Sequence, residues 1–151
     1  MSADSPSSEH APLATRTAGS VALIVEDTPD LRSLFAKELS EAGFKVVQAH
    51  DGPSAIEQAH RFSPQAILLD LMLPGINGFS VARLLREDVR TRDAAIVAVT
   101  ALSSETLRTT ALDAGCDICI RKPVAASHVV GQLIGLLERR RASPDVSREK
   151  L

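Results

Sequence analysis

Five short apolar runs recur along the sequence, and a segment with helical spacing follows each of them. The run Ile67–Leu69 is apolar at every position and does not alternate with polar residues. Such a run predicts a strand that is buried on both faces. The five expected strands lie at about Val21–Val25, Phe44–Ala49, Gln65–Leu69, Ala95–Val99 and Ile118–Ile120.

The alternation of strands and helices limits the folds that are open to this chain. Five strand–helix units in a row predict a parallel sheet with helices on both faces. Right-handed crossovers leave few possible strand orders. We therefore expect an α/β fold with a doubly wound, flavodoxin-like sheet of five strands in the order 2-1-3-4-5.

Start and stop signals mark the helices between these strands. Thr28 and Pro29 suit a helix cap and a first helical position, and Gly43 suits a helix end. We expect helices over about 28–42, 53–62, 77–88 and 104–115, and a last helix that closes with Arg139–Arg141. These arginines either attract an anionic partner or complement the helix dipole, which is the commoner role. The apolar helix faces are expected to include Leu34, Leu84 and Leu112.

Size and charge exclude several classes of function. The chain has 151 residues, which suits one domain with a proper core. Its net charge of −2 provides no basic surplus for nucleic-acid binding, and 3% aromatic residues provide no base-stacking platform. No apolar run is long enough for a membrane span, and the first residues lack a signal-peptide pattern. A cytoplasmic location is therefore expected.

The two ends of the chain differ in composition from the middle. Residues 1–20 are rich in Ser, Ala and Pro and show no periodicity, which predicts a disordered N-terminal arm. Residues 21–140 carry the strand–helix pattern and are expected to form the domain. Residues 141–151 are expected to be a flexible tail, so no output domain is expected after the last helix.

The two cysteines have a spacing that is also found in redox and zinc sites. Cys116 and Cys119 lie three residues apart at the start of a predicted strand. Side chains three apart in a strand point to opposite faces, about 10 Å apart, which is too far for a disulfide. No second cysteine pair or histidine cluster completes a metal site. Both cysteines are therefore interpreted as small packing residues.

Polar residues follow four of the predicted strands directly. Glu26 and Asp27 end the first strand, and Asp70 ends the third. Thr100 and Lys122 end the fourth and fifth strands. In an open parallel sheet, the crevice at the carboxyl ends of the strands is the place where ligands bind. Asp70 alone could be a solvated loop residue, and Asp27 alone could be a helix cap, but the five positions together predict one site.

Three carboxylates at one edge repel each other unless a cation joins them. A pair of charges about 4 Å apart costs roughly 1–4 kcal/mol, depending on the dielectric. Oxygen ligands with room for water suit Mg²⁺. Such a site, with the ammonium group of Lys122, could receive a phosphoryl group on Asp70. The Thr100 hydroxyl could bond a phosphoryl oxygen, whereas Lys122 could also be only a salt-bridge partner.

Four motifs then resemble one known family. The similarity covers about residues 20–140. The motifs are Glu26-Asp27, Asp70 with Met72, Pro74 and Gly78 behind it, Thr100-Ala101, and Lys122-Pro123.

In these motifs the sequence resembles the response-regulator receiver domain of two-component signalling. The resemblance implies that Asp70 accepts phosphate from a histidine kinase or a histidine phosphotransfer protein. It implies Mg²⁺ held by Asp27, Asp70 and the backbone carbonyl of Met72, with Glu26 acting through water. It further implies that Lys122 contacts the phosphoryl group and that the Lys122-Pro123 peptide bond is cis.

The sequence departs from the family pattern at two places. Family members couple Thr100 to an aromatic side chain three residues before the lysine, and this position is Cys119 here. We expect the signal to pass through the segment after Thr100 instead, with Cys119 as a small packing contact. Met72 and Leu102 occupy positions that influence loss of the phosphoryl group in the family. Neither side chain can orient a water molecule, so we predict a long-lived phosphoryl group.

The resemblance favours a stand-alone response regulator that binds effector proteins or passes phosphate along a relay. Direct binding of nucleic acid or membrane is not expected, and a phosphorylation-dependent homodimer is compatible with the sequence. One alternative is a phosphohydrolase of the haloacid-dehalogenase type, but such enzymes usually have an acid at the position of Met72. Another alternative is an interaction module that needs no phosphate. An enzymatic role is not expected beyond slow autodephosphorylation.

Overall fold

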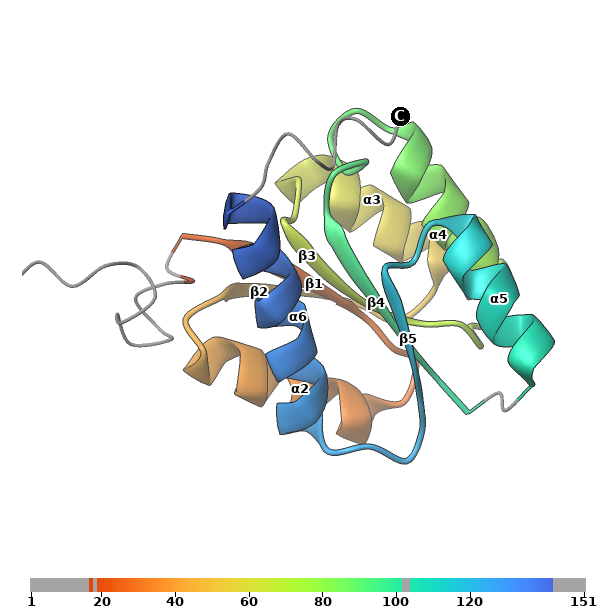
Figure 1. Cartoon of the computed structure of the whole chain (residues 1–151), viewed down its shortest axis with the longest axis horizontal. Helices are drawn as coiled ribbons and strands as arrows, with labels where there is room; N and C mark the ends of the chain where they lie inside the picture. The colour runs from red at the N-terminus through yellow and green to blue at the C-terminus, as the bar shows by residue number, and fades with distance from the viewer. Residues whose placement is uncertain (1–16, 18, 102–103, 143–151) are drawn as a thin grey trace, which may run out of the picture.

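A computed structural model describes residue 17, residues 19–101 and residues 104–142 of the chain. Their core is a five-stranded parallel sheet with the strand order β2-β1-β3-β4-β5 (Figure 1). This order confirms the predicted doubly wound α/β fold, with β1 and β3 side by side at the centre. The strands are β1 (Val21–Val25), β2 (Lys45–Ala49), β3 (Ala66–Asp70), β4 (Ala95–Thr100) and β5 (Ile118–Arg121).

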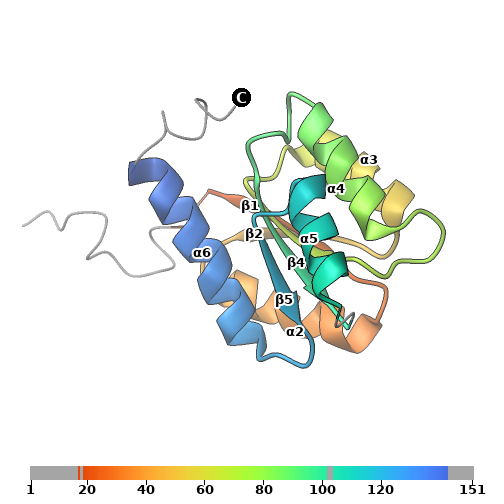
Figure 2. The same ribbon diagram turned by 45° about the vertical axis from the view of Figure 1, so that its right-hand side comes forward.

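The helices divide into two layers, one on each face of the sheet. Figure 2 shows α2 and α6 together on one face and α3, α4 and α5 on the other. The bounds agree with the sequence prediction to within about two residues at most ends, which is the usual precision of such bounds. The helices are α2 (Pro29–Glu41), α3 (Gly52–Phe62), α4 (Gly78–Glu87), α5 (Glu105–Ala114) and α6 (Ala126–Ala142).

The sheet separates two apolar clusters. Every residue of β3 and β4 is buried, because both strands are covered by helices on both faces. Side chains such as Leu23, Ile67 and Ile96 pack under α3, α4 and α5. Side chains such as Ile24 and Val97 pack under α2 and α6. This burial on two sides explains why the strand sequences do not alternate.

Three leucines on the predicted apolar helix faces are exposed instead. Leu34 is 49% exposed, Leu84 is 43% exposed and Leu112 is 40% exposed. In α4 the sheet is covered by Val81 and Leu85 together with small residues, so Leu84 lies at the margin of the buried face. The 3.6-residue period identifies such a margin, but the neighbouring elements decide whether it is covered.

The described residues extend beyond the predicted domain bounds at both ends. Thr17 and Ser20, in the segment predicted to be an arm, are buried. The Thr17 hydroxyl donates a hydrogen bond to the carbonyl of Ala42, and Ser20 accepts one from the amide of Lys45. At the other end α6 continues to Ala142. Residues 1–16 and 143–151, on which the rest of the arm and tail predictions fall, lie outside the described residues.

A charged cluster holds together the amino-terminal ends of β4 and β5. The Asp117 carboxylate accepts hydrogen bonds from Arg86 at 3.0 Å and from Arg140 at 2.8 Å. It also accepts one at 2.8 Å from the backbone amide of Ile96 in β4. Arg86 donates further hydrogen bonds to three backbone carbonyls, including that of Gly115 at 2.8 Å. The sequence predicted for Arg140 either an anionic partner or an interaction with the helix dipole. The ion pair between Arg140 and Asp117 of the same chain was not predicted.

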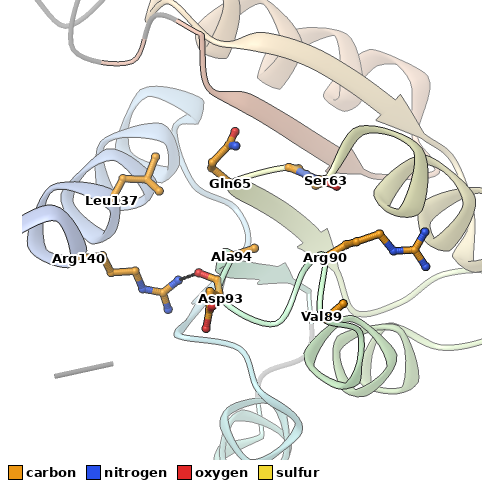
Figure 3. Close-up of a pocket in the computed structure, with 9 residues that line it drawn as sticks. Ser63, Gln65, Val89, Arg90, Asp93, Ala94, Leu137 and Arg140 are labelled. Atoms are coloured by element: carbon orange, nitrogen blue, oxygen red, sulfur yellow. Dashed lines mark hydrogen bonds between the residues drawn. The ribbon is translucent and has the colours of Figure 1, made fainter. Parts of the chain in front are cut away.

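A hollow of about 450 Å³ lies beside this cluster, at the amino-terminal edge of the sheet (Figure 3). Arg90 and Arg140 line it, but both guanidinium groups already have partners. Arg90 pairs with Asp88 through two hydrogen bonds of 3.0 and 2.8 Å. Arg140 donates to Asp117 and to the carbonyl of Asp93. These pairings make the hollow a poor receptor for a phosphoryl group.

Candidate functional site

Glu26 is a buried carboxylate at the carboxyl end of β1. The residue is 1% exposed, and both of its carboxylate oxygens accept hydrogen bonds. Oε1 lies 3.1 Å from the Lys122 ammonium nitrogen, and Oε2 accepts from the amide of Thr28 at 3.2 Å. Arg32 fixes the same strand end by donating to the Glu26 carbonyl at 2.7 Å. Because both carboxylate oxygens are engaged, Glu26 suits the indirect, water-mediated role predicted for it.

Asp70 stands at the corresponding end of the neighbouring strand β3. It is 5% exposed, and its Oδ1 accepts a hydrogen bond of 2.9 Å from the amide of Met72. Its Oδ2 lies 3.3 Å from the Lys122 ammonium nitrogen. At Gly78 a Cβ atom would lie 2.5 Å from Cα of Leu71 and 2.6 Å from the Asp70 carbonyl oxygen. Only glycine therefore permits α4 to begin so close to Asp70.

Asp27 completes an acidic cluster with these two residues. Glu26, Asp27 and Asp70 each offer a carboxylate oxygen, and these oxygens lie within 4.8 Å of one another. Asp27 is exposed, whereas the other two carboxylates are buried. A set of hard oxygen donors with one side open to water matches the preference of Mg²⁺. The residues thus fit the predicted ion.

Lys122 joins the two buried carboxylates at the end of β5. The side chain is 20% exposed and pairs with both Glu26 and Asp70. Burial lowers the pKa of Lys122, but the two carboxylates outweigh this effect, so its pKa is raised and it is an ammonium ion at neutral pH. The Lys122-Pro123 peptide bond is cis, as the resemblance implied. Lys122 is therefore a salt-bridge partner within the cluster, and this role is compatible with phosphoryl binding.

The carboxyl group of Asp70 has an altered acidity. Its pKa is raised to about 6, mainly by burial. The hydrogen bond from the Met72 amide and the charge of Lys122 lower the pKa, whereas the negative charge of Glu26 raises it. Without a metal ion Asp70 therefore carries a proton more readily than an exposed aspartate. A cation at the cluster would favour the ionised form, which is the form that can act as a nucleophile.

Thr100 lies on β4, the strand next to Asp70, and Cys119 lies on β5, one strand further along the sheet. Val99 of β4 is the register partner of Asp70, so Thr100 lies one residue further along β4. Thr100 is 3% exposed. Its carbonyl accepts a hydrogen bond of 2.7 Å from the amide of Lys122. Cys119 is half-buried beside Ala98 and packs against the cluster under α3, α4 and α5. The predicted role of Leu102 falls outside the described residues.

An apolar hollow of about 430 Å³ opens beside the charged groups, and the sequence did not predict it. Leu31 and Phe35 of α2 were predicted only as core residues, since their spacing is that of a buried helix face. No sequence signal distinguishes a core leucine from one that lines a hollow. The hollow is lined by Leu31, Phe35, Ala101, Lys122, Pro123 and Val124.

Among the described helices, none is both long enough and apolar enough to cross a membrane.

The sequences of known proteins match this chain over the described domain. Residues 22–134 match the family model of the response regulator receiver domain. The phosphate regulon transcriptional regulatory protein PhoB of Klebsiella pneumoniae is 37% identical over 117 residues, which are 78% of this chain and 51% of PhoB. The DNA-binding master transcriptional regulator RpaA of Synechocystis is 34% identical over 126 residues, which are 83% of this chain and 52% of RpaA. The chain thus spans about half the length of these curated relatives.

Solved structures agree with this match. A response regulator of Chloroflexus aurantiacus superimposes with a TM-score of 0.73 and 26% identity, over 79% of this chain and 98% of that chain. The receiver domain of a sensor histidine kinase from Pseudomonas aeruginosa has a TM-score of 0.68 and 31% identity, over 78% of this chain and 99% of that chain. The latter structure holds a magnesium ion in its active-site cleft. With the family match over most of the chain, we conclude that this protein belongs to the response regulator receiver domains of two-component signalling.

Proposed function

We propose that Asp70 is the phosphoacceptor of this chain and that a histidine kinase or histidine phosphotransfer protein supplies the phosphoryl group. One observation carries the proposal: Asp70 is joined to Lys122 at 3.3 Å and lies within 4.8 Å of two further carboxylates. Asp27, Asp70 and the Met72 carbonyl would hold Mg²⁺, with Glu26 acting through water. This ion would neutralise the charge that develops on the phosphoryl oxygens.

The reaction transfers one phosphoryl group between two proteins. An oxygen of the ionised Asp70 forms a bond to phosphorus as the bond from phosphorus to the donor imidazole breaks. The electron pair of the broken bond stays on the imidazole nitrogen, which ends neutral or takes a proton from water. Lys122 is placed to attract the phosphoryl oxygens, and the Thr100 hydroxyl is proposed to donate to one of them.

The chain is proposed to act as a phosphoacceptor and not as an enzyme. A phosphohydrolase that works through an aspartyl phosphate needs an acid or base to activate water. The position two residues after Asp70 is Met72, which is 53% exposed and has no ionisable group. We therefore propose a slow loss of the phosphoryl group, as the sequence predicted.

The output of the chain is proposed to be phosphorylation-dependent protein binding or a phosphorelay in the cytoplasm. A phosphoryl group brings a charge of about −1.5 to −2 to the sheet edge. The aromatic residue that usually reports this change is replaced by Cys119, so we propose that the segment after Thr100 carries the signal. Operation as a stand-alone regulator is also a proposal. The named relatives are transcriptional regulators of about twice the matched length, and the match to them covers only the receiver domain.

Magnesium binding should raise the thermal stability in a pH-dependent way. An ion that binds only the folded state, at a free concentration 100 times its dissociation constant, raises the free energy of unfolding by about 2.7 kcal/mol. For a domain of this size the rise in Tm is roughly 5–10 °C. Asp70 has a raised pKa of about 6, so its ionised form, which binds the ion, is lost as the pH falls through 6. The Mg²⁺-dependent rise in Tm should therefore be full at pH 7.5 and small at pH 5.

The same raised pKa makes a second, opposite prediction for the metal-free protein. Between about pH 4 and 6 the folded state holds a proton on Asp70 that the unfolded state has released. The Asp70 contribution to the free energy of unfolding thus decreases as the pH rises through this window. Calorimetry with EDTA or Mg²⁺ measures both effects. Asp113→Asn on the exposed side of α5 is the control, and an equal Mg²⁺ response at pH 5 and 7.5 would contradict the acidic site.

The apolar hollow beside Lys122 supports a protein as the phosphodonor. Leu31 on α2 lines this hollow and gives a partner an apolar surface next to the acceptor. Leu31→Asp should slow phosphotransfer from a phosphorylated histidine protein roughly tenfold, as truncation of an interface anchor does. Labelling by acetyl phosphate, which needs no docking surface, should stay close to wild type.

The matched control is Leu84→Asp, because Leu84 is an exposed helical leucine on the opposite face of the sheet. Transfer rates are measured by quenched-flow gel assays with the protein donor. Equal slowing by both variants, or equal slowing with acetyl phosphate, would show that Leu31 acts through the fold and not through docking.

A further inference from the structure

The loop between β3 and α4 carries Met72, whose carbonyl is a proposed ligand of the metal ion. Two side chains of this loop point into the core, since Leu71 is 2% exposed and Leu73 is 9% exposed. The Leu71 carbonyl accepts a hydrogen bond of 3.1 Å from the amide of Gly78. Together with the hydrogen bond from the Met72 amide to Asp70, these contacts hold the first residues and the end of the loop, and they leave residues 74–77 to be fixed by another contact.

Ile76 provides this contact by packing on the first turn of α3. A Cβ atom at Gly52 would collide with Cγ2 of Ile76 and would lie 3.2 Å from Cβ and 3.3 Å from the carbonyl oxygen of the same residue. Gly52 is buried, and Ile76 packs against the apolar cluster under α3, α4 and α5. The side chain of Ile76 therefore occupies the space that any other residue at position 52 would need.

The first turn of α3 is itself held in place. Asp51 caps the helix by accepting a hydrogen bond of 2.8 Å from the amide of Ser54, and the Ser54 hydroxyl accepts one of 3.3 Å from the amide of Asp51. This reciprocal pair is a capping box, which fixes the direction of the helix start. The backbone position of Gly52 is thus fixed. A side chain added at position 52 must therefore displace Ile76 and the loop that carries it.

We infer that Gly52 is a positioning residue for metal binding, because the missing side chain lets Ile76 hold the loop whose Met72 amide bonds Asp70 and whose Met72 carbonyl is the proposed ligand. The inference rests on the proposed function, since it concerns the same metal ion. It adds a residue of α3, an element that contributes no ligand to the site. Residues that support a metal ligand change metal affinity about 10- to 100-fold when they are replaced.

The experiment measures the dissociation constant of Mg²⁺ by calorimetry, because the chain has no Trp or Tyr to report binding by fluorescence. Gly52→Ala should weaken Mg²⁺ binding about tenfold. It should also shift the amide resonance of Met72 in nitrogen-15 spectra of the metal-free protein. Gly131→Ala on α6 is the matched control, because a Cβ atom at Gly131 meets no atom within 4 Å.

A double variant separates the contact with Ile76 from other effects. Gly52 precedes Pro53, and a proline ring restricts the backbone of a preceding residue that has a Cβ atom. Ile76→Ala removes the Cγ2 atom and leaves this restriction in place. Only the contacts of 3.2 and 3.3 Å with Cβ and the carbonyl oxygen then remain, so in the Ile76→Ala background Gly52→Ala should weaken Mg²⁺ binding much less, which gives a strong coupling in the double-mutant cycle.

Three results would overturn the inference. An unchanged Mg²⁺ affinity of Gly52→Ala with a lowered Tm would make Gly52 purely structural, and an additive double variant would exclude the contact with Ile76. Absence of Mg²⁺ binding by the wild type would overturn the proposed function together with the inference. If Gly52→Ala does not fold, Ile76→Ala must weaken Mg²⁺ binding while Val89→Ala, at a residue that is 72% exposed, does not.

Discussion

Asp70→Asn should abolish phosphorylation of the protein by acetyl phosphate and Mg²⁺. The wild type should gain a single adduct of about 80 Da, the mass of one phosphoryl group, while the variant gains none. An amide oxygen is a far weaker nucleophile than a carboxylate, and no other carboxylate has the contacts that Asp70 makes with both Met72 and Lys122 among the described residues. Intact-mass spectrometry measures the adduct directly.

The same assay separates the competing functions. Asp113→Asn, at an exposed position of α5, should give the wild-type adduct and serves as the matched control. Continued release of free phosphate without a stable adduct would support a phosphohydrolase. A wild type that never gains the adduct, although it is folded and binds Mg²⁺, would support an interaction module that needs no phosphate.

Asp117→Ala should lower the free energy of unfolding by about 3 kcal/mol, the low end of the range for breaking a buried ion pair. The low end applies because Asp117 is 23% exposed and its partners Arg86 and Arg140 are 21% and 26% exposed. The variant leaves two guanidinium groups and the Ile96 amide without their shared acceptor. Tm should fall by roughly 6–12 °C.

Urea unfolding of Asp117→Ala gives this free energy, and Glu41→Ala is its control. Glu41 pairs with Lys37 at 3.4 Å on the surface, where both side chains are at least 60% exposed. Loss of such a pair costs about 1 kcal/mol or less. The Mg²⁺ affinity of Asp117→Ala should match that of the wild type, since the cluster lies at the opposite edge of the sheet. Equal stabilities of the two variants would show that the cluster adds nothing beyond surface pairing.

The sequence predicted the sheet and the acidic site because both follow from short patterns. Apolar runs that end in Glu26, Asp70 and Lys122 indicate buried parallel strands, and the strand order then brings their ends together. Lys122 and Glu26 are 96 positions apart in the sequence and 3.1 Å apart in the fold. This proximity depends only on topology, which the strand–helix alternation limits to a few possibilities.

The features that the sequence did not predict depend on side-chain packing. The exposure of Leu84 depends on how α4 is rotated against its neighbours, and periodicity alone leaves that rotation uncertain at the margins. Asp117 and Gly52 carry no motif of their own. Asp117 acts through residues of α4 and α6, and Gly52 acts through a residue of the next loop, so each is identified only once the contacts are known.

The Asp117 cluster and the acidic site lie at opposite ends of the same strands. Asp117 fastens β4 and β5 at their starts by accepting hydrogen bonds from the Ile96 amide and from Arg86 and Arg140, whereas carboxylates that repel one another collect where the strands end. Changes in the length or composition of loops near the acidic site should therefore leave the hydrogen bonds of Asp117 intact. Substitutions in these loops can therefore change which partner the acidic end contacts, while the hydrogen bonds of Asp117 keep the opposite end of the sheet in place.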